Sequence, residues 1–291
     1  MNLFPPKFID KFFLYVQTSI KRFIHKLTKD KSLSKGGMHM SFFNKFSKFH
    51  KIYFLVFFTF NIILFVGNIY NTTPMSSALT PLSIVALIST LTGIFAAIYT
   101  ARGEVTAYIW GFFNVVSYIF VSYSRHFYGE VILYTLYMLP MQFVGYYTWY
   151  KSAKESKSGH VEAKRMTVKT WGIFVILFII IWGLYATFVY HLPNILYLTS
   201  GIIIPPDKTF LIDSLTATLT ISAVILATNR FVEQWYMWII SDSIGIVLFI
   251  ISIIESGSIT MSAISGAMMW IQFTTNAIYG YYVWRRLNKK Q

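Results

Sequence analysis

The chain has 291 residues, of which 55% are hydrophobic and 19% aromatic, while only 12% are charged and the mean hydropathy is +0.55. This composition excludes a soluble globular domain and a disordered chain, and it is typical of an integral membrane protein. The sequence contains no cysteine, which excludes disulfide bonds, thiolate metal sites and cysteine nucleophiles. No long polar block is available for an extramembrane catalytic domain, so we expect the function to lie within the membrane-spanning part.

Eight stretches are long and apolar enough to cross a hydrocarbon layer about 30 Å thick, a distance that takes about 20 helical residues. These stretches lack the strict apolar–polar alternation of a membrane β-barrel, so an all-α bundle is predicted. The predicted spans are residues 52–70, 83–101, 105–124, 131–150, 170–190, 211–229, 235–254 and 258–284.

The formal net charge is +14, and the basic residues lie in the segments outside and between the predicted spans. If the amino terminus is cytoplasmic, the cytoplasmic segments hold 23 of the 25 Lys and Arg residues, and only Arg125 and Lys208 fall outside. This distribution obeys the positive-inside rule. We therefore expect a multi-pass membrane protein with both termini in the cytoplasm, and no nucleic-acid partner.

Three segments outside the spans are polar. Residues 1–51 combine a helical apolar spacing with basic residues, which predicts an amphipathic helix on anionic inner-leaflet lipids or a disordered segment. A cleaved signal peptide is disfavoured, because the apolar run is short and no small-residue cleavage pattern follows it. Residues 151–169 form a cytoplasmic linker near the middle of the chain, and residues 285–291 form a cytoplasmic tail.

The chain contains an internal repeat. An offset of 128 aligns Thr100, Arg102, Trp110 and Asn114 with Thr228, Arg230, Trp238 and Asp242, and an offset of 135 aligns the run Gly-Tyr-Tyr-Thr-Trp at 145–149 with Gly-Tyr-Tyr-Val-Trp at 280–284. Two three-helix repeats are therefore predicted, at 83–150 and 211–284. The single span 170–190 between them makes the repeats parallel, and 52–70 is an additional amino-terminal span. This 3+1+3 layout is typical of transporters.

Four polar residues on four predicted helices lie eight or nine residues from the cytoplasmic ends of their spans, at a depth of about 12–14 Å. A common depth near the middle of the membrane indicates a shared cavity. An Asp at a helix centre costs roughly 2.5–3.5 kcal/mol on insertion scales, a cost accepted where the group is paired or lines a wet cavity. The alternative is that the amides only hold helices together by hydrogen bonds. The four residues are Asn114, Gln142, Asp242 and Asn276.

Neighbouring positions extend this candidate binding site. Trp110 and Trp238 precede Asn114 and Asp242 by one turn, where their rings could stack on a flat heterocycle. Gln272, one turn from Asn276, suits a binding or a packing role equally. Asp213, near the outer start of its span, is an N-cap or an outer gate.

Aromatic and proline residues near the span ends suggest mainly structural roles. Trp149, Trp284, Tyr281 and Tyr282 are expected to be interface or packing residues. Pro140 is expected to kink its helix beside the candidate site. No phosphate-binding loop and no zinc motif is present, so we expect no cofactor, no metal and no enzymatic activity, and regard an intramembrane enzyme or sensor as the rival class.

The sequence also resembles a known family. The residues that carry the resemblance are Gln142-x-x-Gly145-x-x-x-Trp149, Arg230-x-x-Glu233-x-Trp235-x-x-Trp238-x-x-x-Asp242 and Asn276-x-x-x-Gly280-x-x-x-Trp284. Together they are similar to the PnuC family of bacterial vitamin transporters, over about residues 80–286. Gln142 and Asp242 stand where the nicotinamide riboside members frequently carry Asn.

The resemblance implies a SWEET-like bundle in the bacterial cell membrane. It implies uptake of nicotinamide riboside, for NAD biosynthesis, by facilitated diffusion with trapping by intracellular phosphorylation. Thiamine, riboflavin and deoxynucleosides remain alternative substrates, and a homo-oligomer stays open. The implied substrate-binding residues are Trp110, Asn114, Gln142, Trp238, Asp242 and Asn276.

Overall fold

The structure is a computed structural model that describes residues 46–71, 80–124, 127–156, 160–207, 209–256 and 261–289. The predicted lipid-binding segment therefore lies almost entirely outside the described residues, as do Arg125 and Lys208. Within the described part, helices cover all eight predicted spans, and the chain divides into two compact units. Four of these helices, α3, α4, α8 and α9, are long and apolar enough to cross a membrane by length and composition.

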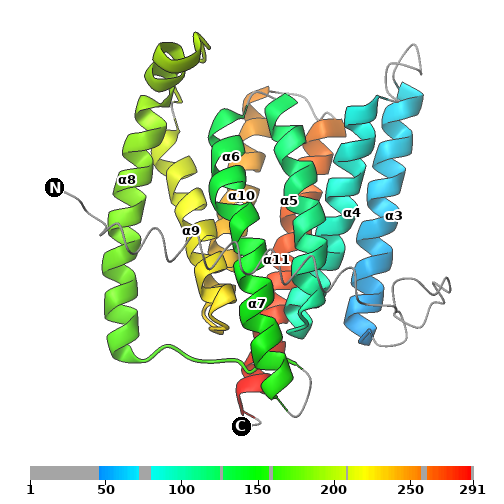
Figure 1. Ribbon diagram of the computed structural model, residues 1–291. Coiled ribbons are helices and arrows are strands. Elements are labelled where there is room, and N and C mark those ends of the chain that lie inside the picture. The colour runs from blue at the N-terminus through cyan, green and yellow to red at the C-terminus, as the bar shows by residue number, and fades with distance from the viewer. Residues whose placement is uncertain are drawn as a thin grey trace. The chain divides into compact units, whose positions relative to one another are not determined.

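The first unit contains helix α3 (Lys48–Asn71), α4 (Pro81–Arg102), α5 (Thr106–Ser124), the π-helical turn η2 (Tyr134–Met138) and α7 (Leu139–Glu155). Helix α4 begins with a capping box between Thr80 and Ser83, followed by proline in the first turn. Helix α5 packs against both α4 and α7, and α3 runs along the outside of α4 (Figure 1). The π-helical turn lies directly before Pro140, where the missing backbone N–H disturbs the regular hydrogen bonds.

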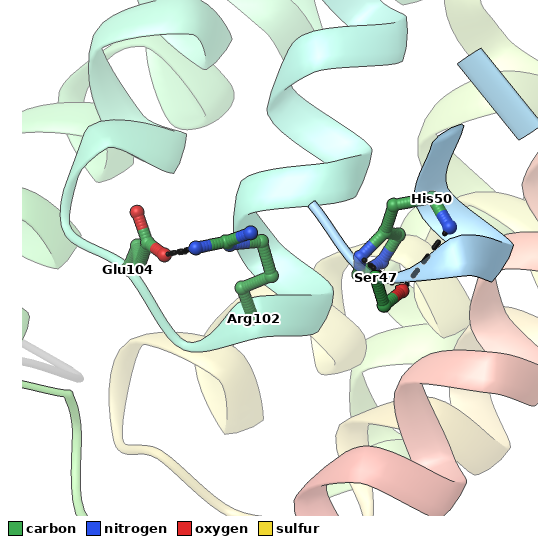
Figure 2. Close-up of polar contacts among 4 residues, drawn as sticks. All are labelled: Ser47, His50, Arg102 and Glu104. Carbon is green, nitrogen blue, oxygen red and sulfur yellow. Dashed lines mark hydrogen bonds and ion pairs between the residues drawn. The ribbon is translucent and has the colours of Figure 1, made fainter. Parts of the chain in front are cut away.

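Helix α3 is fastened to α4 by a small aromatic and charged cluster at one end of the first unit. Arg102 forms an ion pair with Glu104, and its guanidinium lies over the Phe46 ring, 5.4 Å from the centroid. Ser47 caps the start of α3 by accepting a hydrogen bond from the His50 backbone N–H (Figure 2). Phe46 and His50 are both buried. The extra amino-terminal helix is therefore an integral part of this unit.

The second unit contains α8 (Val168–Ser200), α9 (Phe210–Thr228), α10 (Gln234–Ser256) and α11 (Met261–Lys289). The short helix α6 (Tyr128–Leu133) begins in this unit. Helix α9 packs against α8 and α10, and α10 packs against α11 (Figure 1). Helix α8 exposes most of its apolar side chains, as expected for a helix that faces lipid, and it is longer than predicted. The last turns of α8 bend away from its axis (Figure 1), and the helix contains Pro193 in its second half.

Each unit has a turn of the same conformation between its first and second helices, α4 and α5 in one unit and α9 and α10 in the other. Gly103, after α4, has φ 66°, and Arg230, after α9, has φ 67°. The backbone N–H of each donates to the carbonyl three residues earlier, and the following N–H donates to the carbonyl five residues before it. The carbonyl of each also accepts a hydrogen bond from the linker, from Val161 in the first unit and from Lys164 in the second. We call the end of each unit that carries this turn its turn end.

These hydrogen bonds show that the predicted offset of 128 residues between the two repeats is wrong by one residue. They match at an offset of 127 residues, because Gly103 corresponds to Arg230, whereas the matching letters gave 128. The second helices are therefore shifted by one residue, about 100° around the helix axis, relative to the predicted pairing. Asn114 corresponds structurally to Ser241, and Asp242 corresponds to Val115.

A ring packed on a glycine joins the second and third helices of each unit near the turn end. In the first unit a Cβ at Gly145 would overlap the Tyr108 ring, and Trp149 meets that ring edge-on at 5.0 Å. In the second unit a Cβ at Gly280 would overlap Trp235, which meets Trp284 edge-on at 6.0 Å. Trp149 and Trp284 are fully buried, so they are packing residues. The repeated Gly-Tyr-Tyr-x-Trp run thus encodes a close helix contact.

Candidate functional site

In the first unit, Asn114 is committed to an interhelical hydrogen bond. Its side-chain Nδ2 donates to the Ser89 backbone carbonyl on α4 at 2.7 Å, and the Ser89 hydroxyl donates to the Asn114 backbone carbonyl at 3.4 Å. Such bonds contribute about 0.6 kcal/mol in membranes. The same place in the second unit is occupied by Ser241, whose hydroxyl donates to the Thr216 carbonyl on α9 at 3.4 Å. Asn114 and Ser241 therefore fasten the second helix of each unit to the first.

Gln142 contacts α5 close to Asn114. Its side-chain oxygen fills the space left by Gly111, so a Cβ at that position would overlap it, and its Nε2 donates to the Met138 carbonyl at 3.3 Å. Three residues separate Tyr108 from Gly111 on α5, and three separate Gln142 from Gly145 on α7, so the helices run antiparallel with matched spacing. Gln142 lies at the height of Gly111, about 4.5 Å along the axis from Asn114. The first unit therefore places these two amides within about one helical turn of each other in height.

Trp110 is held by other aromatic rings of the first unit. It stacks on Phe95 of α4 with a centroid distance of 4.5 Å and an interplanar angle of 24°, and Phe95 in turn packs on Phe54 of α3. One face of this indole is therefore covered by protein. This contact supports the packing role more than the binding role predicted for Trp110.

In the second unit, the buried carboxyl group of Asp242 lies on the side of α10 that faces α11. Trp235, Asp242 and Gly245 share this face because they are spaced by seven and three residues. Trp235 packs on Gly280, and Gly245 packs against the ring of Trp270, both on α11. Asp242 is 4% exposed, and its carboxyl group has no hydrogen bond or ion pair with any other described residue.

Gln272 and Asn276 lie at nearly the same height as Asp242. Ten residues separate Trp235 from Gly245 on α10, and ten separate Trp270 from Gly280 on α11, so residues between these contacts can be matched. By this spacing Asp242 is about 1.5 Å in height from Gln272 and about 4.5 Å from Asn276. Both amides are almost completely buried. The second unit therefore brings three of the predicted site residues to one level.

Trp238 and Asp213 occupy different surroundings. Trp238 packs against a buried apolar cluster formed by Leu219, Ala223, Leu226 and Met237. Asp213, in the first turn of α9, accepts a hydrogen bond from the Thr209 hydroxyl at 2.6 Å. Asp213 thus takes part in a local network at the start of the helix, but the N-cap residue of α9 is Thr209, so the N-cap interpretation of Asp213 is wrong.

Several residues that position the polar side chains of the two units were not predicted from the sequence. Tyr108, Gly111, Trp235, Gly245 and Trp270 fix how closely the second and third helices approach. A glycine inside an apolar helix is the one signal that could have found them, because it often marks a close approach of another chain segment.

Membrane-length apolar helices with polar side chains buried between them define a polytopic α-helical membrane protein. The chain belongs to the nicotinamide mononucleotide transporter family, whose sequence profile matches residues 83–286. That range does not include α3.

Individual relatives agree with this assignment. The chain is 26% identical over 268 residues to the nicotinamide riboside transporter PnuC of Neisseria mucosa, and the match covers 91% of both proteins. It is 28% identical over 212 residues to the nicotinamide riboside transporter PnuC of Haemophilus influenzae, covering 72% of this chain and 83% of that protein. A crystal structure of the vitamin B3 transporter PnuC superposes with a TM-score of 0.63 at 26% identity, covering 84% of this chain and 94% of the other.

Proposed function

We propose that this protein is a membrane carrier that takes up nicotinamide riboside by facilitated diffusion. The observation that carries the proposal is the buried Asp242 carboxyl group, which has no protein partner among the described residues and lies level with Gln272 and Asn276. An unpaired polar group inside the membrane is costly and marks a functional site by default. The curated relatives are nicotinamide riboside transporters, which favours this substrate.

The chemistry of these groups suits the substrate. Nicotinamide riboside carries a cationic pyridinium ring, a carboxamide and ribose hydroxyl groups. In the proposed site Asp242 neutralises the cationic ring or accepts from a hydroxyl group, and Gln272 and Asn276 bind the remaining polar groups. Gln142 and the side-chain oxygen of Asn114 are proposed as polar binding groups of the first repeat, with Trp110 beside them, and Trp238 is proposed as an aromatic contact of the second repeat. Asp213 serves as an outer gate.

The proposed mechanism is alternating access around this site. The chain forms a 3+1+3 bundle of parallel repeats, with α8 as the connecting helix, α3 as an addition and both termini in the cytoplasm of a bacterial cell. The matching turns and ring-on-glycine contacts of the two units support the duplication. Net uptake follows the gradient, and intracellular phosphorylation traps the product. Thiamine, riboflavin and deoxynucleosides are the alternative substrates within the same class.

Two measurements test this function. Titration of the purified protein with nicotinamide riboside, thiamine, riboflavin and a deoxynucleoside should give saturable binding of nicotinamide riboside at the lowest concentration. Counterflow of labelled nicotinamide riboside in proteoliposomes should then show exchange of the unmodified solute. Chemical conversion of the solute would instead identify an intramembrane enzyme. Tighter binding of thiamine, riboflavin or the deoxynucleoside would identify that compound as the substrate in place of nicotinamide riboside.

A further inference from the structure

The eight tryptophans of the chain differ in what holds their indole rings. Trp110, Trp149, Trp171, Trp235 and Trp284 each have an aromatic ring as a neighbour, and the indole N–H of Trp182 donates to the Leu211 carbonyl and to Ser214. Only Trp238 and Trp270 have neither a ring partner nor a hydrogen bond with another described residue. No other aromatic ring of the described residues therefore covers either of these two indoles.

Trp270 is placed with unusual precision for a side chain without a ring partner. Three atoms of its fused rings lie where a Cβ of Gly245 would be, so the indole rests on the backbone of α10. Any residue other than glycine at position 245 would displace it. One part of the ring system is thus fixed by α10, while the side chain as a whole stays partly exposed.

The two tryptophans lie on either side of Asp242 in height. Trp238 is four residues from Asp242 toward the turn end. Trp270 lies at the height of Gly245, three residues from Asp242 in the opposite direction. The two indoles are therefore separated by about 10.5 Å along the axis, with the Asp242 carboxyl group near the midpoint. Toward the turn end, the fully buried Trp235 and Trp284 close the same helix interface.

We propose that Trp270 is a specificity-determining residue that stacks on the flat ring of the solute bound at Asp242. This inference rests on the proposed function and adds a contact to it. Gly245 is its positioning residue, because it lets the indole lie flat on α10 one turn from the carboxyl group. The first repeat has no such platform, since the position that corresponds to Gly245 is Tyr118, whose ring packs on Tyr134 at 4.6 Å.

Purified protein titrated with nicotinamide riboside tests this contact, with affinity and quenching of tryptophan fluorescence as the two readouts. Trp270→Leu should weaken binding about tenfold and remove part of the ligand-induced quenching, because a stacked aromatic pair contributes an effect of that order. Trp270→Phe should keep the affinity within about threefold. The matched control is Trp171→Leu, which removes an indole that packs on Phe174 of the same helix.

A second pair of variants keeps the test valid if Trp270→Leu folds poorly. Gly245→Ala displaces the indole without removing it and should also weaken binding, whereas Gly183→Ala adds a methyl group in open space on α8 and should not. Wild-type affinity and quenching in both Trp270→Leu and Gly245→Ala would overturn the inference and leave the proposed function intact. Failure of the wild-type protein to bind any solute of the panel would overturn both.

Discussion

The second helices of the two units, α5 and α10, differ in where they direct their polar side chain. On α5 that side chain is Asn114, which bonds to the backbone of α4, the first helix of its unit. On α10 the equivalent bond is made by Ser241, so that Asp242, one residue later, is turned toward α11. A shift of one residue thus separates a structural amide from an unpartnered carboxyl group. The interhelical bond is therefore present in both units, whereas the unpartnered carboxyl group is present only in the second of these two helices.

Substitutions of Asp242 and Asn114 should show the largest difference in uptake between the two units. We expect Asp242→Leu to lower saturable uptake about ten- to hundredfold, because a hydrogen bond to a charged group contributes about 1.5–3 kcal/mol. Asn114→Leu should lower the free energy of unfolding and reduce uptake less than Asp242→Leu does. Initial uptake rates, normalised to the amount of folded protein, check both. Equal losses in the two variants would show that Asn114 binds the solute as directly as Asp242.

The ring-on-glycine contacts should prove equivalent in the two units. Gly145→Ala and Gly280→Ala should each lower the free energy of unfolding by about 1–3 kcal/mol, because the added methyl group overlaps a buried ring. Thermal unfolding in detergent measures the change, with Gly172→Ala in α8 as the control, since nothing lies within 4 Å of a Cβ there. If the control loses as much stability as the two variants, helix propensity and not packing explains the effect.

Substitution of Trp110 should mainly affect stability, whereas substitution of Trp238 should mainly affect binding. Trp110 stacks on Phe95, so Trp110→Leu should mainly reduce stability, by about 0.5–1.5 kcal/mol beyond the loss of buried area. Trp238 packs on a buried apolar cluster that a leucine would still contact, and it has no ring partner among the described residues, so Trp238→Leu should mainly weaken binding. Comparing the melting temperature and the dissociation constant of both variants is the check. A larger loss of affinity in Trp110→Leu would reverse the assignment.

The smallest effect is expected at the shared turn. Gly103→Ala forces a Cβ into the left-handed region and should cost about 1–2 kcal/mol of stability, whereas Arg230→Gly should relieve a penalty of similar size. Thermal unfolding of both variants tests this opposite response. Destabilisation by Arg230→Gly would mean that contacts of the arginine side chain outweigh its backbone strain.

The sequence was sufficient to predict the helices and the repeat, but not the faces of the helices. Hydropathy located the eight spans, and in the described part of the chain a helix or a run of consecutive helices corresponds to each of them. The one-residue error in the repeat arose because Arg230 adopts a backbone conformation that usually needs glycine, so the letters aligned Arg230 with Arg102 and not with Gly103. Facing directions depend on packing between helices, such as Trp270 on Gly245, and the glycine alone does not say which side chain fills the space beside it.

The most direct test of the binding site is an experimental structure of the protein with nicotinamide riboside bound. The account predicts the solute within hydrogen-bond distance of the Asp242 carboxyl group, with Asn114 still donating to the Ser89 carbonyl. A solute bound away from α10, with Asp242 paired to another protein group, would contradict it.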